Sequence, residues 1–148
     1  ARNALLGESE IEYNHARLID LGRLVLCSLM VGACQGAVDF VIEYGNQRIA
    51  FGEPITHRQS VAFTIADMAT ETEAMRMMVL RAASRAEQGL PFQKEAFLAH
   101  VFCAEHSMDI GSNAVQLLGG HGFVCEHLAE LWYRQLRSGA VVVGNVMA

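Results

Sequence analysis

Apolar residues recur at the three- and four-residue spacing of an α-helix over most of the chain, and breaks containing Gly or Pro separate these stretches. The pattern predicts four helices, at about 15–44, 56–87, 93–118 and, shorter, 126–137. Short connections between consecutive helices favour antiparallel neighbours. The predicted fold class is all-α: an antiparallel up-down four-helix bundle with three long helices and one shorter helix.

The first predicted helix is apolar around most of its circumference in the middle, which indicates burial on several sides. Its uncharged stretch, 24–38, would span ~22 Å as a helix, less than the ~30 Å hydrocarbon core of a membrane. We therefore expect a buried core helix and no membrane span. Ser28, Gly32 and Gly36 recur every four residues, and this row of small side chains predicts the close approach of another helix.

The second and third predicted helices each carry an apolar stripe that should face the core. The stripe of the second helix consists of Val61, Ile65, Met68, Met75, Val79 and Ala82, and that of the third consists of Phe97, Val101, Ala104, Met108, Val115 and Leu118. Thr56 and Gln59 have the spacing of a capping box, in which the Thr oxygen accepts a backbone N–H and the Gln reaches back. The second helix is therefore expected to begin near Thr56.

Composition narrows the class of protein. With 52% hydrophobic and 18% charged residues, the chain is not a disordered segment. A net charge of −5 without a basic run argues against binding to nucleic acid or an anionic membrane surface. No signal peptide is predicted, so the expected location is the cytoplasm, or the mitochondrial matrix in a eukaryote. No Cys-x-x-Cys pair occurs, and the cysteines are expected to be small buried residues in a reducing compartment: Cys27, Cys34, Cys103 and Cys125.

Two sequence features suggest chemistry at first sight. His100, Cys103 and His106 spread over ~120° of a helix surface, and structural zinc needs four ligands at known spacings, so no metal site is predicted. The glycine-rich segment 119–122 follows a helix and not a strand, which excludes a dinucleotide-fold fingerprint. It is either a helix C-cap with positive-φ glycines or a backbone that closely approaches a phosphate, because both need residues without a Cβ.

Several blocks of sequence, in order along the chain, carry a resemblance to a known family. They are NALLGE (3–8), LIDLGR (18–23), RIAFGEPITHRQ (48–59), AVQLLGGHGF (114–123) and WYR (132–134). Together they resemble the C-terminal helical domain of the acyl-CoA dehydrogenases, the flavin enzymes of fatty-acid and branched-chain β-oxidation. The resemblance implies that 1–14 is the exit from a missing β-domain and that 15–148 forms the helical bundle.

The resemblance also implies binding roles. Arg48 is expected near the FAD pyrophosphate across a dimer interface, and 116–120 along the ADP half of a neighbouring subunit's FAD. The implied cofactor contacts are Arg48, Phe51, Gln59, Gln116, Gly119 and Gly120. Asp20 and Arg23 match contacts to the CoA part of the substrate. The chemistry agrees, because the planar donor fork of arginine suits a pyrophosphate and paired glycines permit close backbone approach.

The catalytic base is where the chain departs from the family. Members remove the proton α to the thioester with a glutamate and pass hydride from the β carbon to flavin. The usual glutamate position corresponds to Val143, and the alternative position in some members corresponds to Gly22. Neither residue supplies a carboxylate, so no catalytic residue is predicted here. In addition, Gln135 replaces the usual Asp and His100 replaces a common Lys.

Three hypotheses for the function follow. The first is a domain of an FAD-dependent acyl-CoA dehydrogenase, catalysing α,β-desaturation of an acyl-CoA thioester, with its base supplied by another subunit or an unusual position. The second is a non-catalytic partner subunit of a heteromeric dehydrogenase or a family relative with different flavin chemistry. The third is an assembly-only bundle that binds neither flavin nor CoA.

The expected partners are an acyl-CoA substrate, the missing N-terminal and β-domains, and further subunits in a homo-oligomer (dimer or tetramer) or heteromer. A domain that packs on two others should keep exposed apolar patches, so self-association is expected. The 148-residue chain alone is predicted to lack dehydrogenase activity, because the acyl and flavin pockets need the missing domains.

Overall fold

The computed structural model describes residues 14–142. Within that part, the helices are α1 (His15–Gln47), α2 (Gln59–Glu87), α3 (Gln93–Leu118) and α4 (Ala129–Val142). An antiparallel hairpin, β1 (Ile49–Ala50) and β2 (Glu53–Pro54), and the 3-10 turn η2 (Ile55–His57) connect α1 to α2, and a second 3-10 turn, η3 (Gly119–Phe123), follows α3. The predicted all-α bundle of three long helices and one shorter helix is confirmed. The predicted linker, apart from residue 14, and residues 143–148 lie outside the described residues.

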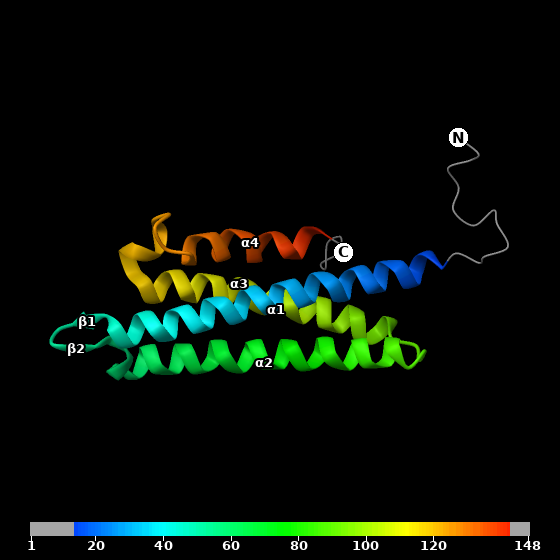
Figure 1. Ribbon diagram of the computed structural model, residues 1–148, viewed down its shortest axis with the longest axis horizontal. Coiled ribbons are helices and arrows are strands. Elements are labelled where there is room, and N and C mark those ends of the chain that lie inside the picture. The colour runs from blue at the N-terminus through cyan, green and yellow to red at the C-terminus, as the bar shows by residue number, and fades with distance from the viewer. Residues whose placement is uncertain (1–13, 143–148) are drawn as a thin grey trace.

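The central pair of the bundle is α1 and α3. Consecutive helices run antiparallel, so α1 and α3 run in the same direction. Figure 1 shows them side by side in the middle, with α2 along one side and α4 along the other. The C-terminal ends of α1 and α3 and the N-terminal ends of α2 and α4 therefore meet at one end of the molecule.

The core lies along α1, which packs against all three other helices. The largest fully buried side chains of the core are Val41, Met68, Met75, Ile110 and Leu136. The predicted stripe of α2 is confirmed, with Val61 and Ile65 half-buried and the other four members buried. The cysteine prediction holds for Cys27, Cys34 and Cys103, which are fully buried, and is wrong for Cys125, which is exposed in the loop before α4.

By length and composition, α1 is apolar enough to cross a membrane, with a mean hydropathy of 1.9 in its most apolar window. It has an ordinary structural reason for this composition, because it is the central helix of the bundle and contacts the other three. Of that window 39% is buried in the described structure, so burial in the core accounts for part of the apolar stretch and the rest is exposed.

The row of small residues on α1 packs only at its C-terminal member. A Cβ on Gly36 would lie 3.3 Å from the Trp132 ring of α4, whereas Ser28 and Gly32 are exposed. The prediction of close packing along the whole row is wrong, because its N-terminal half faces away from the other helices. The same stretch of α1 exposes large apolar side chains, which confirms the expected apolar patches: Leu18, Leu21, Val25 and Leu29.

The predicted capping box is also wrong. Thr56 lies in η2, where its hydroxyl donates a hydrogen bond to Asn46 Oδ1 at 2.9 Å, and α2 begins only at Gln59. The cause is the hairpin, which folds the chain back so that the Ile55 N–H donates to the Arg48 carbonyl at 3.0 Å. The Thr56 hydroxyl is thereby directed at the end of α1 and away from the first turn of α2.

The inner face predicted for α3 is partly wrong. Phe97 and Met108 are exposed, and smaller residues face the core in their place: Ala96, Ala99, His100, Cys103, Ser107, Ile110, Gly111 and Ala114. Because α3 packs between α1, α2 and α4, close neighbours select small side chains on much of its surface. A Cβ on Gly111, for example, would lie 3.1 Å from the Tyr133 Cα.

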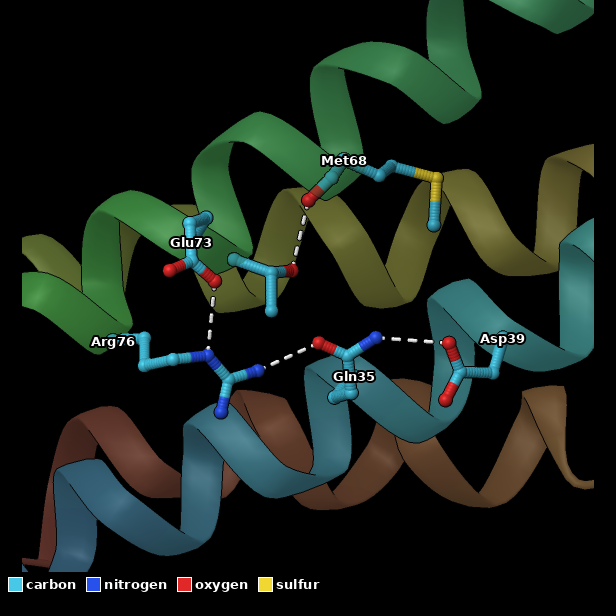
Figure 2. Close-up of polar contacts among 6 residues, drawn as sticks. Gln35, Asp39, Met68, Glu73 and Arg76 are labelled. Atoms are coloured by element: carbon cyan, nitrogen blue, oxygen red, sulfur yellow. Dashed lines mark hydrogen bonds and ion pairs between the residues drawn. The ribbon is translucent and has the colours of Figure 1, made fainter.

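A polar bridge joins α1 to α2 (Figure 2). Arg76 Nη2 donates to Gln35 Oε1 at 2.6 Å, and Gln35 Nε2 donates to Asp39 Oδ1 at 2.8 Å. In the core beside it, the Thr72 hydroxyl donates to the Met68 carbonyl at 2.8 Å, so this buried polar group is satisfied. The bridge pairs specific positions of the two helices and so favours one register between them.

The turn after α3 yields a stability prediction. A Cβ on Gly122 would lie 2.8 Å from the Cα of Val115, so Gly122→Ala must displace backbone and should destabilise the protein by about 1–3 kcal/mol. Gly120→Ala is the matched control, since an added Cβ there meets nothing within 4 Å. Thermal unfolding of the full-length variants measures both, and an unchanged melting temperature for Gly122→Ala would contradict the tight packing of this turn.

Candidate functional site

A groove lies at the end of the bundle where α1 and α3 finish and α2 begins. It consists of two adjoining cavities of about 590 and 500 Å3. Ile55, Gln116 and Leu117 line both of them. The groove therefore runs past the end of α3, and its lining comes from two stretches that are distant in sequence, 44–64 and 116–124.

The first cavity contains most of the predicted cofactor residues. Arg48, Gln116, Gly119 and Gly120 all line it, and all four are exposed. The Arg48 backbone N–H ends α1 by donating to the Tyr44 carbonyl at 2.8 Å, while its side chain makes no ion pair within residues 14–142. The result is an unpaired cation at the mouth of an open cavity.

The glycines of this cavity serve the turn and also leave its surface open. Gly119 ends α3 with a φ of 61°, which confirms the predicted glycine C-cap. A Cβ on Gly119 or Gly120 would meet nothing within 4 Å, so the backbone there is accessible from the cavity. The two alternatives predicted for the segment 119–122, a helix C-cap and a backbone open to close approach by a phosphate, are therefore compatible.

The second cavity contains Phe51 and the start of α2. Phe51 has a φ of 56°, a strained conformation for a bulky residue, and its ring is 94% exposed. The Arg58 guanidinium lies 4.9 Å from the centre of that ring. Gln59 is exposed as the first residue of α2 and, unlike its neighbours Arg58 and Ser60, does not line the cavity.

Sequence reasoning missed the aromatic wall of the first cavity. Tyr44 and His121 line it, and the Tyr44 hydroxyl lies 3.4 Å from His121 Nδ1. The signal was present, because Tyr44 precedes Arg48 by one helical turn and so shares its face of α1. Arg58, which lines the second cavity, is adjacent in sequence to the predicted contact Gln59, so the sequence could also have pointed to Arg58.

Asp20 and Arg23 lie in the other half of α1. Twenty-five residues separate Arg23 from Arg48, which is ~38 Å along a helix, so the structure does not bring the two groups together. Arg23 Nη1 donates to Asp20 Oδ1 at 2.8 Å, and the Asp20 side chain is nearly fully buried. The Arg23 guanidinium also lies 5.7 Å from the Phe97 ring centre.

His100 is buried on α3, near Arg23. Both ring nitrogens lack a hydrogen-bond partner within the described part of the chain, and the side chain is 2% exposed. Burial, together with the positive charge of Arg23, lowers the pKa of His100. Residues 14–142 contain no group of three or more His, Cys, Asp or Glu side chains placed to hold a metal ion.

No catalytic nucleophile or base stands out in the described residues. Burial, with a further contribution from Glu71, raises the pKa of the Cys34 thiol to about 12. Gly22 is exposed, and an added Cβ there meets nothing within 4 Å. Val143, the other position that corresponds to the usual base of the family, lies outside the described residues.

The four-helix bundle, with a groove at the end where α1 and α3 finish, defines the class of this protein as an all-α domain. Residues 13–146 match the family described as "Acyl-CoA dehydrogenase, C-terminal domain". The chain therefore belongs to the acyl-CoA dehydrogenase family, and it corresponds to the C-terminal domain.

Individual relatives agree with this assignment. The chain is 36% identical over 142 residues to the short-chain specific acyl-CoA dehydrogenase, mitochondrial, of Rattus norvegicus, covering 95% of this chain and 34% of that protein. It is 38% identical over 141 residues to the caffeyl-CoA reductase-Etf complex subunit CarC of Acetobacterium woodii, covering 95% and 37%. The solved butyryl-CoA dehydrogenase of Megasphaera elsdenii matches with a TM-score of 0.86 at 30% identity, over 88% of this chain and 34% of that one. The chain thus spans about a third of these relatives.

The burial of His100 predicts a pH dependence of stability. Because the folded-state pKa lies below the unfolded value of about 6.5, the unfolded state binds more protons, and stability should fall as the pH drops below about 6.5. His100→Leu should flatten this dependence, whereas His106→Gln, at a half-buried histidine 3.3 Å from Glu71, should keep the contribution of His100. Urea unfolding of the full-length protein between pH 5 and 8 measures it, and equal slopes for wild type and His100→Leu would contradict the assignment.

Proposed function

We propose that the groove binds part of an FAD molecule and that the full-length protein is an acyl-CoA dehydrogenase-like flavin oxidoreductase. The observation that carries this proposal is the first cavity, which is lined both by an arginine without an ion pair in the described part of the chain and by an accessible glycine backbone. The family is FAD-dependent, and the domain would contribute one edge of the cofactor site. Polypeptide outside this chain, including a neighbouring subunit, would supply the rest.

The residues fit a dinucleotide. Arg48 presents a planar set of donors that suits a pyrophosphate, and Gly119 and Gly120 allow its oxygens to approach backbone N–H groups. Gln116 lines both cavities and can donate or accept a hydrogen bond. Phe51 and Arg58 extend the groove with an exposed ring and a second cation.

The substrate proposed is an acyl-CoA thioester. Asp20 and Arg23 are the proposed contacts to its CoA part, and the 2.8 Å ion pair holds the arginine in a defined orientation on α1. Bound FAD would accept the hydride from the β carbon while a base takes the α proton. The role of this domain is then to bind and orient, and to assemble subunits through apolar surface such as the exposed face of α1.

A second candidate function is a non-catalytic partner subunit in a heteromeric dehydrogenase. The observation that favours it is the absence of a carboxylate at Gly22 and Val143. In that case the groove would complete the cofactor site of the partner, and the partner would carry the base. The assembly-only alternative differs from both because it requires no flavin.

The flavin proposal is tested by the variant Arg48→Met of the full-length protein. Loss of a charge-assisted hydrogen bond to the pyrophosphate should weaken FAD binding about tenfold or more, measured as the dissociation constant of the apoprotein for FAD. Arg137→Met, at an exposed arginine of α4, is the control and should leave the affinity unchanged. A full-length protein that purifies without flavin and does not take it up would favour the assembly-only alternative.

The importance of the missing catalytic base is tested by introducing a glutamate at the two positions where the family usually has one. Val143→Glu, or Gly22→Glu, should raise acyl-CoA-dependent dye reduction by about a hundredfold if the missing carboxylate limits turnover. Gly32→Glu places the same side chain at another exposed, sterically open site on α1 and should have no effect. Wild-type turnover that neither glutamate raises would show that the base comes from another position or subunit.

A further inference from the structure

Five rings gather beside the first cavity, and together they fasten η3 and the following loop to α1. Their centres are 5.6 to 6.5 Å apart in successive pairs: Trp132, Phe40, Tyr44, His121 and His127. Only Tyr44 and His121 of this group line the cavity. The other three lie behind them and support their positions.

His121 is able to carry a proton without losing its support. Its Nδ1 lies 3.4 Å from the Tyr44 hydroxyl, which can donate to the neutral ring or accept from the protonated one. The other ring nitrogen, Nε2, makes no hydrogen bond within residues 14–142, and the side chain is exposed at the cavity. The imidazole therefore has a free donor position on the same cavity wall as Arg48.

We propose that His121 is a second cationic contact to the diphosphate of a bound dinucleotide, acting beside Arg48. The proposal rests on the proposed function, because it takes FAD as the occupant of the groove. A protonated histidine is a cation, and its charge would add to that of Arg48 on the cavity wall. The FAD diphosphate keeps its charge while the histidine titrates, so the affinity for FAD should rise as the pH falls.

The surrounding charges allow this assignment. On α1, Glu43 accepts a hydrogen bond from Gln47 at 3.1 Å, and Arg48, just after α1, makes no ion pair within residues 14–142. The last part of α3, 110–118, contains no charged residue. At the start of α4, Glu130 is bonded to Arg134 at 2.7 Å. The remaining titratable groups nearby are Tyr44 and the loop residues Cys125, Glu126 and His127.

The test is the dissociation constant of the full-length apoprotein for FAD, measured at pH 6.0 and 8.5. Wild type should bind FAD about three- to tenfold more tightly at pH 6.0. His121→Asn, permanently neutral, should bind equally at both pH values with the weaker affinity. His121→Lys, permanently charged at these pH values, should bind equally at both with the tighter affinity.

Matched controls separate His121 from its neighbour. His127→Asn makes the same substitution on the ring 5.6 Å away, which does not line the cavity, and should retain the wild-type pH dependence. FAD binding that is tight but independent of pH in wild type, or a pH dependence that survives in His121→Asn, would overturn the role of His121 alone. A wild-type protein that binds no FAD at either pH would overturn the proposed function and, with it, this inference.

Discussion

The parallel contact between α1 and α3 is the constraint on which the groove depends. The two helices can pack closely because both contribute fully buried small side chains to the common core: Cys27, Cys34 and Ala37 on α1, and Ala99, Cys103 and Ala114 on α3. Since both helices run the same way, their last turns finish at the same end of the molecule. Arg48 and Gly119 meet for this reason, and a shift of one turn between the helices would separate them by ~5.4 Å.

The sequence predicted the helices well because long helical periods are a strong signal, but it could not assign their faces. Phe97 and Met108 are apolar and helically spaced, yet α3 packs between three helices through small residues, and that choice depends on distances between helices. Thr56 failed as a cap for a similar reason, because the hairpin redirects its hydroxyl to Asn46. Periodicity reports which residues are apolar, while the neighbours decide which of them are buried.

The candidate site, like the fold, was predicted from the sequence only in part. The resemblance predicted four residues of the first cavity, Arg48, Gln116, Gly119 and Gly120, and these positions are brought together by the structure. It assigned no role to Tyr44 or His121, although Tyr44 stands four residues before Arg48 and His121 lies within the block 114–123, because both rings reach the cavity only when η3 folds onto α1. The separation of Arg23 from this cavity follows directly from the length of α1 and could be calculated from the sequence once the helix was predicted.

The polarity of the helices explains why the first cavity needs side-chain cations. It lies at the C-terminal ends of α1 and α3, where the helix dipoles present partial negative charge, so the helices themselves disfavour an anion there. Arg48 and a protonated His121 oppose this field. The second cavity instead adjoins the N-terminus of α2, whose first N–H groups have no side-chain cap and carry partial positive charge. The N-terminus of α2 and the permanent charge of Arg48 therefore attract an anion at any pH, and a protonated His121 would add to this attraction at the first cavity.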